Sequence, residues 1–543
     1  MENKIVVRNT SIIINDYHLG DVPKLEEIFR IFNPITHSFD TFGMYYDEAN
    51  CKLYLPAGLD LWKIKSYFNE KYYDRQYEHP YSSTGNILLK YKPRDEKQEE
   101  AIRFMVGVNE YSDNKYCNQL SVNLNTGKGK TYCSIATFSF FRIKTMIITG
   151  TTTLLSQWES EILHYTNLQK SDIVFISGSD VVNMILMGKS KKAENGKIFL
   201  CSHGTLRSFA DQYGWDKIYD LFQILGIGIK VFDEAHTNFA NMLMIDFFTN
   251  VWRTYYVTAT PGRSSWREDR IFQLSIKNVP GIDLFDENND PHTSYVAIKW
   301  NSQPTPQQIS ACKNKYGLDR MKYIDYITKN PRFYDMMRVI MELVIKCKGR
   351  VLMYVGTNDG ILRVYHWICE NYPEFLGDIG IFTSLISHDE KMKEKQKKLL
   401  LSTTKSAGLG EHIAGLKMTI VIAEPFKSEI IARQTLGRTR DDKTMYVELV
   451  DLGFKYIKKF YYDKLPVFNK YALDTSDTLI DNYELTRRSE NIVAERSTCR
   501  ISPIVMDDKR FDFSKVLPKK KDENSGVICP IEFIDSNKKP GFN

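Results

Sequence analysis

Short apolar runs alternate with amphipathic stretches through the middle of the chain. Predicted helices precede or follow these runs, for example at 132–141 and 155–163. The apolar runs themselves are at 144–149, 173–176, 197–201, 229–232 and 255–258. Buried strands that alternate with helices are typical of a parallel sheet with helices on both faces. The pattern therefore predicts an α/β fold.

A second set of strands and helices follows a polar stretch at about 262–294 that contains Gly, Pro, Asp and Asn. Helices are predicted at 333–345 and 360–370, because their apolar residues recur at helical spacing. Strands are predicted at 350–355, 379–382, 399–402 and 418–423. The two sets predict a first lobe at 89–275, and a linker with a second lobe at 276–455.

The two ends of the chain have different patterns. Residues 1–88 contain strand-like runs at 11–15 and 51–56 and a helical pattern at 23–32, which predict a small α+β domain. No basic stripe or aromatic motif decides whether it is an accessory nucleic-acid-binding domain or a packing cap on the next lobe. Residues 456–543 predict a mixed extension with two helices and a flexible basic tail.

Composition narrows the class of protein. Of 543 residues, 43% are hydrophobic and 26% are charged, which is typical of a globular protein with several domains. The formal net charge of +6 is compatible with a polyanionic partner but does not demonstrate one. Nine cysteines without a C-x-x-C pair argue against a zinc module and a disulfide framework. No apolar run has the length of a membrane span, so we expect an intracellular, soluble protein in the cytoplasm, or in the host cytoplasm if it is viral.

Residues 123–131, with the sequence NLNTGKGKT, are the strongest candidate for chemistry. Gly127 and Gly129 permit a tight turn whose backbone N–H groups face phosphate oxygens. Lys130 supplies a charge for the β- and γ-phosphates, and Thr131 offers a hydroxyl to Mg²⁺. The full pattern has a glycine where Leu124 stands. We expect this phosphate loop to follow a strand and to open the helix at 132–141.

Two adjacent carboxylates follow the strand at 229–232. Asp233 is a candidate Mg²⁺ ligand, and Glu234 is a candidate for orienting and polarising the attacking water. Asp-Glu pairs are common on surfaces, but this pair follows a buried strand at the edge of the sheet where ligands bind. The position therefore favours a catalytic role.

Further polar residues lie near the predicted strand ends or before a helix. Gln98 stands just before a helix and has an amide suited to an adenine base, although a surface glutamine is the alternative. Thr151 and Ser202 follow strands, and Thr258 and Thr260 stand at a strand end that Pro261 terminates. These hydroxyls are candidates for ligand contacts.

An arginine-rich stretch closes the second lobe. Residues 433–440, with the sequence RQTLGRTR, carry three arginines. A guanidinium that reaches a transferring phosphoryl group would act as an arginine finger, whereas solvated or phosphate-positioning arginines are the alternative.

In their order and spacing, these stretches resemble the motifs of superfamily 2 helicases of the DExH branch, over roughly residues 93–449. The correspondence comprises 126–131 with motif I, 150–158 with Ia, 202–206 with Ib, 233–236 with II in its DEAH form, 258–260 with III, 354–356 with IV, 402–408 with V and 434–440 with VI. Gly150 stands where the family usually has Pro. His412 replaces an Asp in motif V, and Arg440 comes one residue early in motif VI.

The resemblance implies two RecA-like lobes that bind ATP and Mg²⁺. The nucleotide contacts it implies are Gln98, Thr126, Gly127, Lys128, Gly129, Lys130, Thr131 and Arg440, with Thr131 and Asp233 on the metal. The catalytic residues it implies are Lys130, Glu234, Gln434 and Arg438. The coupling residues it implies are His236, Thr258 and Thr260, and the nucleic-acid contacts are Thr151, Ser202, Thr404 and Ser406.

Within the superfamily, the chain most resembles phage and large-virus DNA helicases of the fork-remodelling and recombination type, a group that includes poxvirus-like transcript-release helicases. This implies an ATP-dependent DNA helicase or translocase, with DNA expected rather than RNA, no membrane partner and a monomeric state. Three alternatives stay open: an RNA-directed or transcript-release ATPase, a double-stranded-DNA translocase without strand separation, and a binding protein whose ATPase has decayed.

Overall fold

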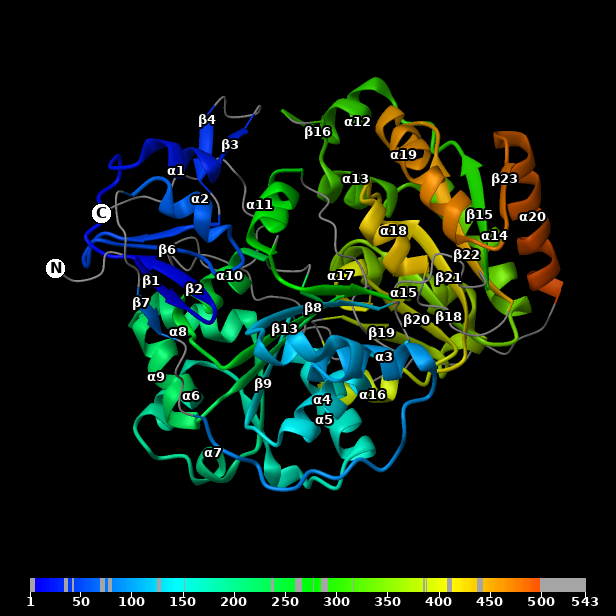
Figure 1. Cartoon of the computed structure of the whole chain (residues 1–543). Helices are drawn as coiled ribbons and strands as arrows, with labels where there is room; N and C mark the ends of the chain where they lie inside the picture. Colours follow the sequence, from blue (N-terminus) through cyan, green and yellow to red (C-terminus); the bar gives the residue numbers. More distant parts are fainter. Residues whose placement is uncertain are drawn as a thin grey trace. The chain divides into compact units, whose positions relative to one another are not determined.

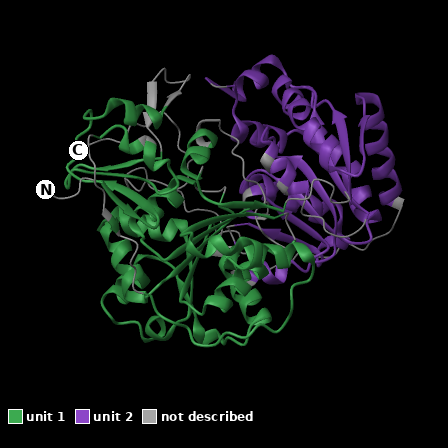
Figure 2. Ribbon diagram, in the orientation of Figure 1, with its two compact units in different colours: residues 1–286, 533–543 green, residues 287–532 purple. Residues whose placement is uncertain are grey.

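The computed structural model of the protein describes residues 5–33, 38–41, 43–68, 74–76, 81–124, 128–150, 152–235, 239–258, 266–276, 278–284, 292–315, 317–383, 386, 388–407, 413–436 and 443–498. The described residues form two compact units, the first ending at 284 and the second beginning at 292 (Figures 1 and 2). Each unit contains a parallel seven-stranded sheet. The predicted α/β class with two parallel-sheet lobes is therefore confirmed.

The sheet of the first unit has the order β10-β11-β9-β12-β13-β8-β14. All neighbouring strands are parallel, so their carboxyl ends meet at one edge. The strands are β8 (Gln119–Asn123), β9 (Thr145–Thr149), β10 (Ile173–Ile176), β11 (Ile198–Ser202), β12 (Ile229–Asp233), β13 (Arg253–Thr258) and β14 (Gly281–Asp283). The predicted strands between 144 and 258 are confirmed, with ends that differ by one or two residues.

Helices cover both faces of this sheet (Figure 1). Successive residues of β9 point to opposite faces, since Met146 and Ile148 join one core and Ile147 joins the other. The core around Ile147 includes α3 (Glu96–Val106), α4 (Lys130–Phe141) and α5 (Thr152–Tyr165). The opposite core includes α6 (Ser179–Leu186), α8 (His203–Tyr213), α9 (Asp216–Leu225), α10 (Phe239–Phe248) and α11 (Trp266–Ile276). Shorter elements are η1 (Asn109–Tyr116), η2 (Lys170–Asp172) and α7 (Lys191–Asn195).

The polar stretch at 262–294 contributes to the first unit more than its composition indicates. The helix α11 packs Ile271 into the core that α10 shares, and β14 pairs with β8. A short edge strand such as β14 has little apolar periodicity, and its pairing partner lies far away in the sequence.

The amino-terminal residues form a second, smaller sheet in the same unit, with the order β5-β6-β2-β1-β7. Its elements are β1 (Ile5–Arg8), β2 (Ser11–Ile14), α1 (Pro23–Ile28), β5 (Tyr45–Asp47), β6 (Lys52–Pro56), α2 (Leu61–Lys65) and β7 (Asp74–Gln76), with a separate hairpin of β3 (Arg30–Asn33) and β4 (Ser38–Thr41). The helix predicted at 23–32 is wrong after residue 28, because the chain turns into β3, which pairs with β4.

This small sheet packs against α10, and Figure 1 shows β6 and α10 side by side. The rings of Tyr54 and Phe248 are 4.7 Å apart between centroids. The Asn9 backbone N–H donates to Asn250 Oδ1 at 2.9 Å, and the Thr10 hydroxyl donates to the Asp246 carbonyl at 2.7 Å. The amino-terminal sheet and one face of the lobe thus share a single hydrophobic core.

The second unit has a sheet with the order β19-β20-β18-β21-β22-β15-β23, again with parallel neighbours. Its strands are β15 (Thr293–Trp300), β18 (Arg350–Val355), β19 (Ile379–Phe382), β20 (Leu399–Ser402), β21 (Leu416–Ala423), β22 (Thr444–Asp451) and β23 (Thr475–Leu479), beside a small hairpin of β16 (Lys313–Asn314) and β17 (Gly317–Leu318). Its helices are α12 (Pro306–Ala311), α13 (Arg320–Ile327), α14 (Pro331–Lys346), α15 (Asn358–Asn371), η3 (Pro373–Phe375), α16 (His388–Glu394), α17 (Thr404–Ala407), α18 (Glu429–Leu436), α19 (Lys455–Tyr471) and α20 (Asn482–Thr498).

The two large sheets have the same topology. When the strands of each sheet are renumbered along the chain, both have the spatial order 3-4-2-5-6-1-7. The repeat is structural, and no matching repeat is visible in the sequence. None of the described helices is long and apolar enough to cross a membrane.

Candidate nucleotide-binding site

The carboxyl edge of the first sheet brings together several of the predicted site residues of that lobe, among them Asp233 and Thr258. Strand β12 ends at Asp233, its neighbour β13 ends at Thr258, and β8 leads into the phosphate loop next to β13. The backbone N–H of Leu124 donates to the Thr258 carbonyl at 3.0 Å, which ties the start of the loop to the end of β13. Parallel pairing thus brings together segments that are more than a hundred residues apart.

Gly129 sets the geometry of the phosphate loop. It stands at the N-cap of α4 with φ of 88°, a left-handed conformation that favours glycine. A Cβ at this position would lie 2.2 Å from Gln98 Nε2, so a side chain would also clash. No side chain among the described residues caps this helix start. The first N–H groups of a helix have no partner within the helix, and such groups commonly bind anions.

Gln98 holds the loop from the side of α3. Its amide oxygen accepts from the Arg94 backbone N–H at 2.8 Å, and its amide nitrogen donates to the Lys128 carbonyl at 3.1 Å. The Asp95 side chain caps α3 by accepting from the Gln98 backbone N–H at 2.9 Å. Both ends of the Gln98 amide are therefore engaged by the backbone here, and its contact with an adenine base stays a prediction.

Lys130 and Glu234 face each other across the site. Lys130 Nζ lies 3.6 Å from Glu234 Oε1, and the two side chains are only 10% and 12% exposed. Lys130 Nζ also donates to the Leu124 carbonyl at 3.5 Å. Glu234 has a φ of 50°, which is uncommon for a residue with a side chain and marks a local constraint directly after β12. The structure thus brings together the predicted phosphate-binding lysine and the predicted water-orienting carboxylate.

Asp233 is buried and held on both carboxylate oxygens. Its Oδ2 accepts from the indole Nε1–H of Trp158 at 2.9 Å, and its Oδ1 accepts from the Glu234 backbone N–H at 3.0 Å. Burial and then the negative charge of Glu234 raise the pKa of Asp233 from 3.8 to about 6, against the lowering effects of Lys130 and Trp158. A cation at this position would favour the ionised form.

The oxygen donors at this edge fit a magnesium ion. Mg²⁺ prefers carboxylate, hydroxyl and phosphate oxygens, and it is commonly bound through one or two carboxylates together with substrate phosphates. Asp233 supplies a buried carboxylate, and Thr131 supplies a hydroxyl in the first turn of α4. We therefore retain these two residues as candidate metal ligands.

Two predicted hydroxyl residues of the first lobe have identified surroundings. Thr258 is buried at the end of β13. Ser202 ends β11 and caps α8, where its hydroxyl oxygen accepts from the Thr205 backbone N–H at 3.2 Å. The Ser202 side chain thus has a structural role, and contact with nucleic acid stays a prediction for it.

In the second unit, Thr404 and Ser406 lie at the start of α17, directly after β20. The Thr404 backbone N–H donates to Glu424 Oε2 at 2.9 Å, and its hydroxyl donates to Oε1 of the same carboxylate. The Ser406 backbone N–H donates to the Thr403 hydroxyl at 3.1 Å. Arg320 also forms an ion pair with Glu424. Glu424 therefore organises the predicted nucleic-acid-binding turn.

Several predicted residues cannot be located. Gln434 belongs to α18, but its side chain is outside the described part of the chain. The other predicted site residues that lie outside the described ranges are Thr126, Gly127, Thr151, His236, Thr260, Arg438 and Arg440.

Two residues with clear roles in the geometry were not singled out from the sequence. Trp158 was noted only as part of a motif, and its bond to Asp233 joins positions 75 residues apart. Glu424 follows the apolar strand β21 as a single carboxylate, without a motif around it. A carboxylate directly after a buried strand is the signal that was available for Glu424.

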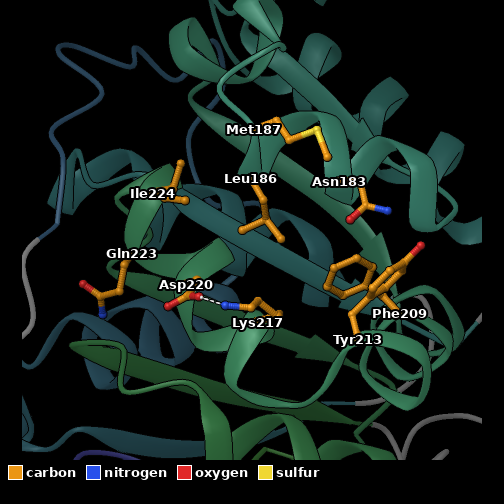
Figure 3. A pocket seen from close by; sticks show the side chains of 9 residues that line it. All are labelled: Asn183, Leu186, Met187, Phe209, Tyr213, Lys217, Asp220, Gln223 and Ile224. Carbon is orange, nitrogen blue, oxygen red and sulfur yellow. Dashed lines mark hydrogen bonds and ion pairs between the residues drawn. The ribbon is translucent and has the colours of Figure 1, made fainter.

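A separate surface cavity of about 430 Å³ lies on the first unit, between α6, α8 and α9 (Figure 3). Lys217 and Asp220 form an ion pair of 2.9 Å beside its mostly apolar lining. The lining residues are Asn183, Leu186, Met187, Phe209, Tyr213, Lys217, Asp220, Gln223 and Ile224. None of the predicted site residues lines this cavity.

Comparison with known sequences identifies a domain in the first lobe. Residues 90–263 match the ResIII family, described as type III restriction enzyme, res subunit. The putative DNA 3'-5' helicase Rad25 of Haloarcula marismortui is 24% identical over 220 residues, which cover 38% of this chain and 32% of the relative. The chain thus matches about a third of the length of this curated relative. Together the two matches support a nucleic-acid-dependent ATPase of the helicase type.

Two solved structures with low sequence identity align with most of the chain. Dbp5 of S. cerevisiae bound to RNA and ADP BeF3 has a TM-score of 0.48 and 14% identity, over 74% of this chain and 93% of that chain. T4 UvsW has a TM-score of 0.33 and 13% identity, over 89% of this chain and 100% of that chain.

Proposed function

We propose that this protein, which carries a helicase-type ATPase domain of superfamily 2 at residues 90–263, is an ATP-dependent motor that moves on DNA and unwinds or remodels DNA branches in replication, recombination or repair. The observation that carries the proposal is the cluster of Lys130, Asp233 and Glu234 beside the start of α4, which no side chain of the described residues caps. A lysine and two carboxylates at a helix N-terminus are the groups that nucleoside triphosphate hydrolysis needs.

In the proposed reaction, the first N–H groups of α4 and the Lys130 ammonium bind the β- and γ-phosphates of ATP. Lys130 must exchange Glu234 for phosphate when the nucleotide binds, because its ammonium group now lies beside that carboxylate. The exchange releases Glu234 to orient and polarise the attacking water. Thr131 and Asp233 would hold Mg²⁺, which neutralises phosphate charge when it is bound.

The remaining residue roles are proposals that rest on the resemblance. Arg438 would stabilise the charge on the transferring phosphoryl group, with Gln434 as its catalytic neighbour. The bound nucleic-acid strand would contact Thr151, Ser202, Thr404 and Ser406, mainly through its phosphate groups. Binding would therefore depend little on the base sequence.

The choice of DNA is supported by the name of the haloarchaeal relative, a putative DNA helicase. We propose the phage and large-virus group of fork-remodelling and recombination helicases as the subfamily. The grounds are the GRTR sequence at 437–440, the L-x-x-Q-W pattern at 154–158 and the small α+β domain before the first lobe. We also propose that the protein acts as a monomer.

The test is ATP hydrolysis by the purified protein, titrated in parallel with single-stranded DNA, double-stranded DNA, branched DNA and RNA. We expect single-stranded or branched DNA to stimulate turnover, followed by strand separation on forked substrates. Stimulation by RNA alone would replace DNA with RNA as the substrate. Stimulation by double-stranded DNA without strand separation would identify a translocase.

Two variants test the site itself. Lys130→Ala and Glu234→Ala are expected to reduce ATP turnover to background, while the fold and strand binding persist. Lys189→Ala and Glu194→Ala remove exposed side chains of the same lobe and serve as matched controls. Unchanged turnover in either site variant would reject the assignment.

A further inference from the structure

Trp158 connects a helix of the first lobe to the candidate metal ligand. It lies in the second turn of α5, is 2% exposed and packs in the core that α3, α4 and α5 share. Its indole Nε1–H donates to Asp233 Oδ2 at 2.9 Å. Strand β9, which precedes α5, pairs directly with β12, which ends at Asp233. The bond therefore joins the helix after one strand to the carboxyl end of its neighbour.

The indole suits this position because it is a donor only. A tryptophan N–H cannot accept a hydrogen bond, so it favours an oxygen of a carboxylate and disfavours any donor in its place. Its ring is fixed by buried neighbours that include Leu155 and Ile162. The backbone N–H of Glu234 donates to the other oxygen, Oδ1, of Asp233. With one hydrogen bond on each oxygen, the Asp233 carboxylate has little freedom to rotate.

We propose that Trp158 is a positioning residue that orients the Asp233 carboxylate for a divalent cation. The inference deepens the proposed function and rests on it, since it concerns the same nucleotide site. Trp158 does not contact the nucleotide in this proposal; it acts through Asp233. Groups that orient metal ligands in this way typically contribute about 10- to 100-fold to metal affinity or activity.

The Trp158→Phe variant isolates the proposed contact. Phenylalanine keeps an aromatic ring in the core but removes the N–H, which leaves Asp233 Oδ2 without this donor. Trp215→Phe is the matched control, because Trp215 is a partly buried tryptophan of the same unit whose ring stacks on Phe248. Comparison of the two variants separates the loss of the Asp233 contact from the general effect of the substitution.

The contact is measured first without any enzymatic activity, from the indole N–H signals of ¹⁵N-labelled protein. The chain has seven tryptophans, and the signal that Trp158→Phe removes belongs to Trp158. We expect Asp233→Asn to shift that signal. We also expect Mn²⁺, added with ADP as a paramagnetic substitute for Mg²⁺, to broaden it before the other indole signals. A Trp158 signal that neither shifts in Asp233→Asn nor broadens first with Mn²⁺ and ADP would overturn the proposal.

The consequence is measured as the Mg²⁺ concentration that gives half-maximal ATP turnover. We expect Trp158→Phe to raise it roughly 10- to 100-fold and Trp215→Phe to leave it unchanged. If the wild type hydrolyses ATP and the Mg²⁺ dependence of Trp158→Phe equals that of the wild type, the inference fails while the proposed function stands. If the wild type hydrolyses no ATP with any nucleic acid, the proposed function fails, and the Mn²⁺ experiment still decides whether Trp158 reports a metal at Asp233.

Discussion

Lys130 and Glu234 form an ion pair at the residue scale that joins two of the predicted functional groups. Lys130 Nζ lies 3.6 Å from Glu234 Oε1, and both side chains are mostly buried. A buried pair of this kind contributes little net stability, because desolvation offsets most of the attraction. The pair holds Lys130 and Glu234 at a position where a nucleotide phosphate can replace Glu234 as the partner of Lys130.

In EDTA, the stability of Asp233→Asn is expected to depend on pH differently from that of the wild type. The pKa of Asp233 is raised from 3.8 to about 6, mainly by burial, so its ionised form is costly in the folded state. A pKa raised on folding contributes stability that is full below about pH 4 and is lost as the pH rises through about 6. We expect the Tm of Asp233→Asn relative to that of the wild type to rise between pH 4 and pH 7.5 in EDTA, by the equivalent of roughly 1–3 kcal/mol.

Asp211→Asn is the control for this measurement, because Asp211 is an exposed carboxylate that pairs with Arg207 at 3.4 Å. It is expected to change the Tm little. A Tm difference between Asp233→Asn and the wild type that stays constant between pH 4 and pH 7.5 would contradict the raised pKa of Asp233.

At the scale of elements, α10 is anchored by a buried ion pair. Lys230 of β12 donates to Asp246 of α10 at 2.5 Å, and both side chains are almost fully buried. The Tyr256 hydroxyl of β13 donates to the other Asp246 oxygen at 2.6 Å. The amino-terminal sheet is attached at the same place, through the bond from Thr10 to the Asp246 carbonyl. The network thus ties two sheets to one helix.

Asp246→Ala is expected to destabilise the first unit by about 3–5 kcal/mol, because it leaves the Lys230 ammonium buried without its carboxylate. The measurement is amide hydrogen exchange, in which α10 and the amino-terminal strands should lose protection together.

Asp220→Ala is the matched control for that experiment. It breaks the exposed pair with Lys217, which measures 2.9 Å, and is expected to cost less than about 1 kcal/mol. Loss of protection at α10 without any loss in the amino-terminal sheet would show that the two are not coupled through this network.

Two of the elements that sequence reasoning missed share one cause. Residues 23–32 fit helical spacing throughout, yet the chain leaves the helix after residue 28 and forms β3, because a partner strand is available at β4. Strand β22 carries Glu448 in its buried middle, which obscures an apolar run, and Lys464 of α19 compensates that charge. In both cases a partner that is distant or comes later in the chain decides the local structure.

At the scale of the whole molecule, the chain contains two large sheets that have the same strand order. In each sheet the fifth strand along the chain carries an acid at or just after its carboxyl end, Asp233 in the first unit and Glu424 in the second. The first receives an indole N–H, and the second receives the N–H and hydroxyl of Thr404. The same position of the fold thus serves a candidate metal site in one unit and a structural turn in the other.

Nucleic-acid binding by the full chain is expected to depend on salt and little on sequence. If the strand is held mainly through its phosphates, each contact releases counterions, and affinity falls roughly tenfold or more between 50 and 200 mM salt. Fluorescence anisotropy with single strands of equal length and different sequence measures both properties. Affinity that is independent of salt, or that differs strongly between the strands, would contradict phosphate-based binding.

The sequence by itself determined the α/β class, the strands between 144 and 258, and the candidate chemistry of Lys130, Asp233 and Glu234. These depend on local patterns: apolar runs, glycine next to lysine, and carboxylates directly after a strand. The tertiary structure alone decided that Lys130 faces Glu234, that Trp158 holds Asp233, and that both sheets share one topology. Hydrogen bonds between distant segments have no period along the chain, so only the folded arrangement of the strands brings these partners within reach.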